Sequence, residues 1–223
     1  MFLGLLYDAR SIAKRDPAAR STLEVVLLYS GFHALIYHRI AHFFYKCRLK
    51  LIARLISQIG RFMTGVEIHP GAKIGRGLFI DHGMGVVIGE TAEIGDDCTI
   101  YHNATLGGTG KDSGKRHPTI GNNVLISTGA KILGPFKVGD NSRIGANAVV
   151  LQEVEPDSTV IGVPGRVVRR KGQKLTPSTD LDQVHMPDPV SQEFCRLQQR
   201  IHILETALSK YIEVKGDEDF HQE

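Results

Sequence analysis

The strongest constraint on the fold is a six-residue period in the middle of the chain. Aliphatic residues recur at this spacing in three runs: Ile68, Ile74 and Ile80; Ile88, Ile94, Ile100 and Leu106; and Ile120, Ile126, Ile132, Val138, Ile144 and Val150. Many of them precede a glycine, and a small residue often follows four places later, as at Ala72, Ala92 and Ala130. The period differs from the value of about 3.6 for a helix and about two for a half-buried strand.

A hexad period predicts a triangular coil. Each hexad supplies a short strand and its turn, three hexads complete one coil, and the stacked coils bury their aliphatic side chains in the interior. The small residues fit the crowded corners, and glycines relieve the turns. We therefore predict a mainly β protein with a parallel β-helix over residues 65–168, in which thirteen hexads make a little over four coils.

Both flanks of the repeat are predicted to be helical. In residues 1–64, Ser21-Thr22-Leu23-Glu24 has the pattern of a capping box. We interpret Leu23 to Phe44 as one buried or oligomer-facing helix, too polar to span a bilayer, and a helical pattern continues from Leu49 to Phe62. Proline-rich residues 169–189 indicate a linker, and residues 190–215 a C-terminal amphipathic helix that forms a coiled coil or packs on the body.

Composition narrows the classes of partner. The net charge is +3, but the last 51 residues hold five Lys/Arg against ten Asp/Glu, which leaves the first 172 residues at about +8. This excess suits a polyanionic ligand and is modest for a nucleic-acid binder. The three cysteines are far apart, which fits neither a disulfide framework nor a zinc cluster. We expect a cytoplasmic protein with no targeting signal, no membrane association and no metal.

Two interruptions of the repeat are the candidate sites, because a break in a regular solenoid expels residues from the interior. Between Ile80 and Ile88 the interval is eight residues and contains Asp81-His82-Gly83-Met84-Gly85. Between Leu106 and Ile120 it is fourteen, and the glycine-rich, polar text ends in Arg116-His117-Pro118. We predict that the second interruption forms a protruding loop.

The interruptions and their surroundings resemble a known family. The matching strings are Glu67-Ile68-His69-Pro70, Asp81-His82, Gly89-Glu90-Thr91-Ala92, Thr105-Leu106-Gly107-Gly108-Thr109-Gly110-Lys111, Arg116-His117-Pro118, Gly129-Ala130-Lys131-Ile132-Leu133-Gly134 and Gly162-Val163-Pro164. Together they resemble the serine acetyltransferase family from Asp16 to about Arg170. The resemblance implies a left-handed parallel β-helix that assembles as a homotrimer and transfers acetyl from acetyl-CoA to L-serine in cysteine biosynthesis.

The resemblance also assigns roles at the reacting hydroxyl. It implies that His82 is the general base, a task suited to a side chain with a near-neutral pKa, and that Glu67, where many family members have Asp, is its acidic partner. Asp81 and Asp16 would hold the amino end of the substrate, and Arg116 and His117 its carboxylate. The alternatives are a structural histidine at a gap, a solvated loop arginine and a helix-capping aspartate.

The same resemblance implies acetyl-CoA as co-substrate and no further cofactor. The small residues Gly108, Thr128 and Ala146 would lie beside its pantetheine arm. The basic residues Arg166, Arg169 and Arg170 would contact its phosphates, unless they form an ordinary solvated patch. L-Cysteine is expected as a feedback inhibitor. Because the chain ends Phe220-His221-Gln222-Glu223 instead of in Ile, we do not expect its tail to dock into O-acetylserine sulfhydrylase.

Three other functions stay open at this point. A related acetyltransferase could act on a sugar or antibiotic hydroxyl, without the Arg116 and Asp81 clamp. A γ-type carbonic anhydrase would need three histidine ligands for zinc, for which four are available: His69, His82, His102 and His117. A non-catalytic scaffold would use the prism and the C-terminal helix only to assemble partners.

Overall fold

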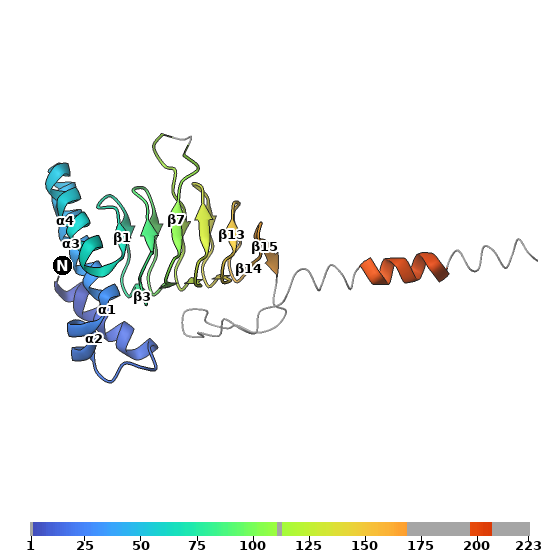
Figure 1. The fold of residues 1–223 in the computed structure, drawn as a ribbon, viewed down its shortest axis with the longest axis horizontal. Helices are drawn as coiled ribbons and strands as arrows, with labels where there is room; N and C mark the ends of the chain where they lie inside the picture. Colours follow the sequence, from blue (N-terminus) through green and yellow to red (C-terminus); the bar gives the residue numbers. More distant parts are fainter. Residues whose placement is uncertain (1, 111–112, 169–196, 207–223) are drawn as a thin grey trace, which may run out of the picture. The chain divides into compact units, whose positions relative to one another are not determined.

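The computed structural model describes residues 2–110, 113–168 and 197–206. The chain divides into two compact units, Met1–Met186 and Pro187–Glu223. In the first, helices are followed by a stack of short strands (Figure 1). The predicted linker 169–189 lies outside the described residues. Of the predicted helix 190–215, residues 197–206 are described and are helical, with exposed side chains.

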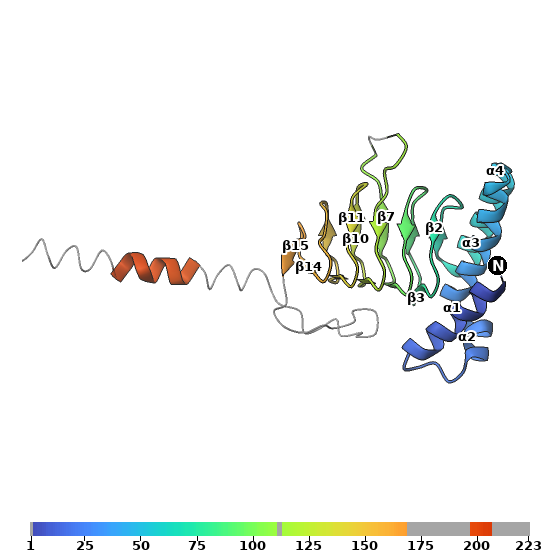
Figure 2. The same ribbon diagram turned by 180° about the vertical axis from the view of Figure 1, so that it is seen from behind.

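The strands form three sheets that enclose a triangular prism (Figures 1 and 2). Sheet A contains β1 (Glu67–Ile68), β4 (Val87–Ile88), β7 (Thr105–Gly107), β10 (Lys131–Leu133) and β13 (Val149–Val150). Sheet B contains β2 (Lys73–Ile74), β5 (Glu93–Ile94), β8 (Thr119–Ile120) and β11 (Lys137–Val138). Sheet C contains β3 (Phe79–Asp81), β6 (Thr99–Tyr101), β9 (Leu125–Ile126), β12 (Arg143–Ile144), β14 (Thr159–Ile161) and β15 (Arg166–Val168). From β1 to β13, consecutive strands fall in successive sheets and the strands within each sheet pair in parallel, which confirms the predicted parallel β-helix.

The aliphatic member of each hexad points into the prism. Leu106 pairs with Ile88 on one side and Ile132 on the other, so residues of the same hexad position stack directly. Ile132 has 0% of its surface exposed, and the corner residues Ala92 and Ala130 are also fully buried. Each such isoleucine or leucine contributes about 1.5–3 kcal/mol of hydrophobic stabilisation. Repetition of one local contact therefore builds the core.

Aspartate and asparagine turn the corner between sheets B and C. Asp97, Asn123, Asn141 and Asp157 all have φ between 54° and 57°, in the left-handed region that short polar side chains tolerate. Their side chains form a ladder, with Asn123 Nδ2 donating to Asn141 Oδ1 at 2.9 Å and Asn141 Nδ2 to Asp157 Oδ1 at 3.1 Å. The hexad pattern predicted glycine at the turns and small residues at the corners, and it does not reveal this row of polar residues.

The prism extends beyond the last predicted hexad. Val154 forms a bridge with Val138, and Val160 lies in β14, where both valines are buried. The interval from Val150 to Val154 is four residues instead of six, so the six-residue period does not reveal this final coil. Strand β15 then pairs antiparallel with β14. Within the predicted span 65–168, the stack therefore contains a final coil that the count of thirteen hexads did not include, and it ends in a hairpin of β14 and β15.

Four helices precede the prism in the described chain: α1 (Phe2–Arg15), α2 (Thr22–Leu28), α3 (Ser30–Lys46) and α4 (Lys50–Thr64). The Ser21 hydroxyl caps α2 by accepting from Glu24 N at 3.1 Å, as predicted. The single helix predicted from Leu23 to Phe44 is wrong, because the chain becomes extended at Tyr29 (φ −86°, ψ 111°). The Tyr29 hydroxyl instead donates to Asp16 Oδ2 at 2.7 Å.

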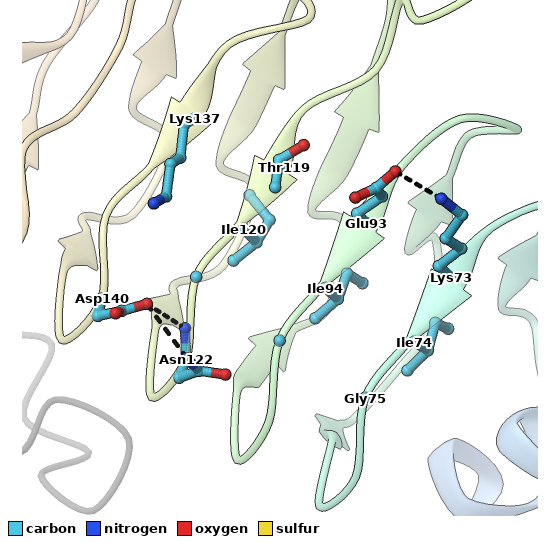
Figure 3. A pocket seen from close by; sticks show the side chains of 12 residues that line it. Lys73, Ile74, Gly75, Glu93, Ile94, Thr119, Ile120, Asn122, Lys137 and Asp140 are labelled. Atoms are coloured by element: carbon cyan, nitrogen blue, oxygen red, sulfur yellow. Dashed lines mark hydrogen bonds and ion pairs between the residues drawn. The ribbon is translucent and has the colours of Figure 1, made fainter.

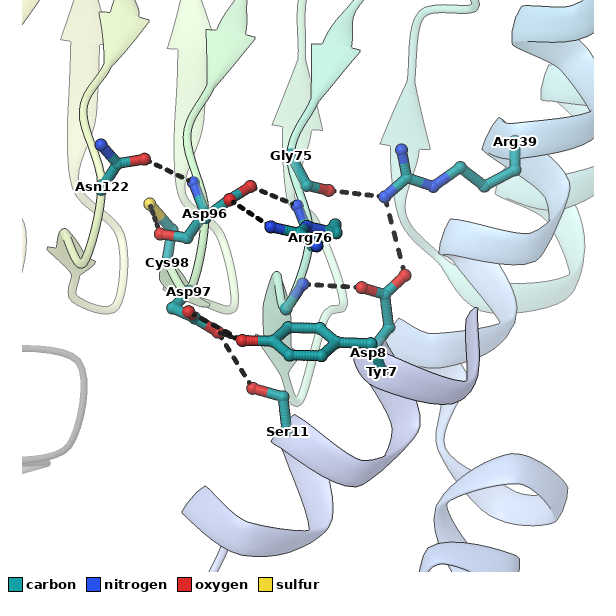
Figure 4. Close-up of polar contacts among 11 residues, drawn as sticks. Tyr7, Asp8, Ser11, Arg39, Gly75, Arg76, Asp96, Asp97, Cys98 and Asn122 are labelled. Atoms are coloured by element: carbon teal, nitrogen blue, oxygen red, sulfur yellow. Dashed lines mark hydrogen bonds and ion pairs between the residues drawn. The ribbon is translucent and has the colours of Figure 1, made fainter. Parts of the chain in front are cut away.

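Polar side chains from the helices form hydrogen bonds with backbone groups at the open end of the prism (Figure 4). Arg39 donates to the carbonyl oxygens of Ile74 at 2.7 Å and Gly75 at 2.5 Å. Asp8 Oδ1 accepts from Gly77 N at 2.6 Å. These backbone groups belong to the first coil, which has no preceding coil to pair with, and an unpaired sheet edge would otherwise invite association. No helix in the described part of the chain is long and apolar enough to cross a membrane.

Helix α3 contacts the prism through Gly31, which generates a first prediction. A Cβ at Gly31 would lie 2.1 Å from the carbonyl oxygen of Ile80, whereas nothing lies within 4 Å of a Cβ at Gly4 in α1. We expect Gly31→Ala to lower the free energy of unfolding by roughly 1–3 kcal/mol through overpacking. Gly4→Ala should cause no loss, because alanine favours a helix by up to about 1 kcal/mol. Urea denaturation of both variants measures this, and equal stabilities would contradict the close approach.

Candidate active site

The predicted site residues divide between two edges of the prism. We call the edge where the chain passes from sheet C to sheet A the C–A edge, and the next one, from sheet A to sheet B, the A–B edge. Asp81 and His82 follow β3 at the C–A edge, whereas Arg116 and His117 precede β8 at the A–B edge. Sheet A lies between the two edges, so one chain does not bring His82 and Arg116 together.

His82 projects from the C–A edge. Its backbone is left-handed, with φ 51°, and 78% of its side chain is exposed. Its Nε2 lies 3.6 Å from Asp81 Oδ1, which is longer than a hydrogen bond. The ring is therefore not sealed inside the prism, and Asp81 is the carboxylate beside it.

The Asp81 carboxylate beside His82 has a second carboxylate, that of Asp16, in its surroundings. Burial raises the pKa of the Asp81 carboxyl, His82 partly opposes this rise, and the negative charge of Asp16 adds to it. Asp16 accepts hydrogen bonds from Tyr29 and, through Oδ1, from Ala18 N at 2.8 Å. Ser21, and not Asp16, is the N-cap of α2. Two neighbouring acids at a partly buried place favour a bound cation, since each opposes the ionisation of the other.

Glu67 lies in β1 and forms an ion pair with Arg61 of α4, with Arg61 Nη1 3.1 Å from Glu67 Oε2. The assignment of Glu67 as partner of His82 stays a prediction. Arg61 was not considered in the sequence analysis, because the helical period places it on α4 without indicating its orientation toward the prism.

His102 is a candidate that the sequence analysis considered only as a zinc ligand. Its ring is 6.4 Å from that of His82, centroid to centroid, at an interplanar angle of 79°. Among the described residues, its buried Nδ1 has no hydrogen-bond partner. His102, Thr128 and Ala146 each follow an inward aliphatic residue by two positions. That offset is the signal by which His102 could have been found.

These three residues form a row along the C–A edge. Gly129 N donates to His102 O at 3.0 Å, and Asn147 N donates to Thr128 O at 2.8 Å, so consecutive coils place them one above another. Thr128 is half-buried and Ala146 exposed. The row begins beside His82 and runs away from the helices.

At the A–B edge, Arg116 is held by a carboxylate that was not predicted. Arg116 Nη2 forms an ion pair with Glu90 Oε2 at 2.5 Å, and Glu90 Oε1 accepts from the Tyr45 hydroxyl at 3.1 Å. The hydrogen bond from Arg116 lowers the pKa of Glu90. Glu90 was part of the Gly89-Glu90-Thr91-Ala92 string, but nothing in a linear pattern shows a contact across 26 residues.

His117 lies against the same edge and is 8% exposed. Burial lowers the pKa of its ring, and the Arg116 charge adds to this effect. Gly108 is close to Arg116, since a Cβ there would lie 2.9 Å from the Arg116 carbonyl oxygen. The predicted loop leaves the prism between β7 and β8 (Figure 1), and its described parts are 108–110 and 113–118.

The remaining predicted ligands are the arginines at the end of the prism and the histidines considered for zinc. Arg166 is exposed in β15, and Arg169 and Arg170 lie outside the described residues. His69 and His117 lie at the A–B edge and His82 and His102 at the C–A edge. Within residues 2–110, 113–168 and 197–206, no three His, Cys, Asp or Glu side chains are placed to hold a metal ion.

A hollow of about 450 Å³ lies on the outer face of sheet B (Figure 3). Within it, Lys73 Nζ donates to Glu93 at 3.0 Å, and Asn122 N donates to Asp140 at 2.7 Å. The predicted site residues lie at the edges instead, so we place the candidate chemistry there.

The repeat and its edge histidine define a hexapeptide transferase. Residues 117–152 match the family model described as bacterial transferase hexapeptide (six repeats). Serine acetyltransferase of Synechococcus elongatus is 56% identical over 93% of this chain and 84% of its own length. That of Bacillus subtilis is 56% identical over 93% of this chain and 95% of its own length. The chain therefore belongs to the serine acetyltransferase family.

Solved structures agree with this assignment. A serine acetyltransferase in complex with cysteine has a TM-score of 0.79 at 40% identity, covering 82% of this chain and 71% of its own. The Neisseria gonorrhoeae enzyme in complex with serine has a TM-score of 0.72 at 41% identity, with coverages of 75% and 68%. The Brucella abortus enzyme in complex with coenzyme A has a TM-score of 0.75 at 45% identity, with coverages of 77% and 68%.

The lowered pKa of Glu90 generates a second prediction. A carboxyl whose folded-state pKa is depressed stabilises the fold above its unfolded pKa of about 4.3, and loses that contribution as the pH falls through the folded value. We expect Glu90→Gln to be less stable than the parent near pH 7 and the two to converge in acid. Denaturant titrations across this range test it, with exposed Glu153→Gln as control. A constant difference at every pH would contradict the prediction.

Proposed function

We propose that this chain catalyses acetyl transfer from acetyl-CoA to the hydroxyl of L-serine, with His82 as the general base. The observation that carries this proposal is the position of His82: an exposed imidazole at a prism edge, with Nε2 facing the Asp81 carboxylate at 3.6 Å. Family membership supports the reaction, and the edge geometry supports the role of the residue.

The proposed reaction needs one proton carrier. His82 takes the proton of the serine hydroxyl as the oxygen attacks the thioester carbonyl carbon. The tetrahedral intermediate then collapses, the carbon–sulfur bond breaks, and the imidazolium returns its proton to the CoA sulfur. The products are O-acetyl-L-serine and CoA. Glu67, which lies in sheet A, would orient the ring of His82. It would give up its ion pair with Arg61 to do so.

Asp81 and Asp16 are suited to hold the ammonium group of serine. Their mutual repulsion, which contributes to the raised pKa of Asp81, would be relieved by a cation between them. Because Nε2 of His82 faces Asp81, an ammonium group bound there brings the serine hydroxyl toward the basic nitrogen. Tyr29 would keep Asp16 in place through its 2.7 Å hydrogen bond.

The row of His102, Thr128 and Ala146 gives acetyl-CoA a path along the C–A edge. Small side chains at Thr128 and Ala146 would allow the pantetheine arm to approach the backbone, with the thioester ending near His82. Exposed Arg166 in β15 lies in the last coil and could contact a phosphate. A bound coenzyme A in the Brucella abortus relative supports this co-substrate.

A second copy of the chain would complete the site. Arg116 and His117 lie at the A–B edge, so a carboxylate held near His82 must meet them from a neighbouring prism. A cyclic homotrimer, in which the C–A edge of each copy meets the A–B edge of the next, satisfies this requirement. L-Cysteine carries the same ammonium and carboxylate groups and would compete for this clamp, in line with the cysteine-bound relative.

A third prediction tests the base. His82→Ala should lower the rate of thiol release from acetyl-CoA with L-serine by a factor on the order of 10² to 10⁴. His202→Ala, an exposed histidine of the 197–206 helix, should leave it unchanged. L-Threonine, L-homoserine and galactosides should be much poorer acceptors. Equal turnover of a galactoside, or an active His82→Ala, would contradict the assignment.

A fourth prediction tests the shared site. His82→Ala and Arg116→Ala homo-oligomers should both be nearly inactive. Random mixing in equal amounts should restore about one quarter of the parental sites, because the intact His82 and Arg116 then come from different copies. Thiol release after co-refolding measures this, with light scattering to establish the trimer. No recovery in a mixed trimer, or a monomer in solution, would contradict the arrangement.

A further inference from the structure

Thr91 forms an unusual number of hydrogen bonds to the segment that carries Arg116 and His117. We propose that Thr91 is a positioning residue that holds His117 as its Nε2–H tautomer, with this N–H directed at the substrate carboxylate. The identity of the carboxylate rests on the proposed function, whereas the tautomer rests on the hydrogen bonds alone.

The hydroxyl of Thr91 has a single possible direction for its hydrogen. Its oxygen accepts from Arg116 N at 3.0 Å and from His117 N at 3.1 Å. A hydroxyl has two acceptor lone pairs and one hydrogen, so both lone pairs are occupied. The same oxygen lies 2.9 Å from His117 Nδ1. The hydroxyl hydrogen is therefore donated to Nδ1.

The backbone of Thr91 leads to the same result independently. Its N–H donates to His117 Nδ1 at 3.2 Å. A backbone N–H can only donate, and so Nδ1 must present a lone pair. In a neutral imidazole the proton is then on Nε2. A proton on Nδ1 would face two donors of Thr91.

The Nε2–H group is left for a ligand. His117 is 8% exposed, and in the described chain its hydrogen bonds use the backbone N–H and Nδ1. In the described chain Nε2 is not one of the buried polar atoms that lack a partner, so it reaches the surface, where a ligand can accept its hydrogen bond. The ring also lies tightly against Gly89, where a Cβ would be 2.1 Å from Nε2. A fixed donor beside the Arg116 guanidinium matches the second oxygen of a carboxylate.

The first test measures the tautomer on the free protein. Nitrogen-15 NMR of the imidazole, assigned with a His117→Gln variant, should find Nδ1 without a proton and Nε2 with one near neutral pH. Thr91→Ser should keep this state because it keeps the hydroxyl. Thr91→Val, which removes only the hydroxyl, should weaken the preference. A proton on Nδ1 in the parent protein would overturn the proposal, whatever the variants do.

The second test measures binding. Thr91→Val should raise the KM for L-serine by about tenfold or more while kcat changes far less, because an interaction that orients the carboxylate is lost in ground state and transition state alike. Thr91→Ser should restore the KM, and Thr206→Val, on the exposed helix, should not alter it. An unchanged KM in Thr91→Val would overturn the proposal. If L-serine were not acetylated at all, the proposed function would fail while the NMR result still decided the tautomer.

Discussion

The stacking of one aliphatic side chain per hexad inside the prism is the contact on which everything else depends. Because Leu106 rests on Ile88 and beneath Ile132, the register of every coil is set by its neighbours. Outward residues at the same hexad offset therefore fall in rows along an edge. The row of His102, Thr128 and Ala146 results from this rule, and so does the stacking of asparagine and aspartate at the corner between sheets B and C. A core built for stability thus also aligns groups for a long ligand.

The residues of the proposed site lie where the six-residue period is interrupted. Two additional residues between Ile80 and Ile88 push His82 outward in a left-handed conformation, and the longer insertion before Ile120 carries Arg116 and His117. Each insertion lies at a different edge, which separates the proposed base from the proposed carboxylate clamp by the width of sheet A. In the proposed trimer each prism would carry two half-sites. The contacts among Thr91, Glu90 and the Arg116 segment hold that segment in place within a single chain.

The repeat could be predicted from the sequence because its contacts are local and periodic. The predicted β-helix follows directly from the spacing, which also located the two insertions, and the family resemblance assigned roles to the residues that they carry. Much of what escaped prediction depends on contacts that are distant in sequence, such as Arg39 with Gly75 and Arg116 with Glu90. The break at Tyr29 escaped for a related reason, since an apolar run predicts a helix, and the extended residue is explained by a hydrogen bond to Asp16. Charge and hydroxyl contacts have no period that a linear pattern could reveal.

The two ends of the prism have a consequence for assembly. A pile of identical coils has no intrinsic length, and an uncovered terminal coil would offer its backbone to the next molecule as a template for fibre growth. Here Asp8 and Arg39 occupy the backbone groups at one end, and the reversed strand β15 pairs with β14 near the other. At the first coil, these hydrogen bonds leave fewer free backbone groups for another prism to pair with. Near the last coil, the antiparallel strand β15 interrupts the parallel pattern that another prism would need to continue. In the proposed trimer, copies would meet through their lateral edges, which is the geometry that a shared catalytic cleft requires.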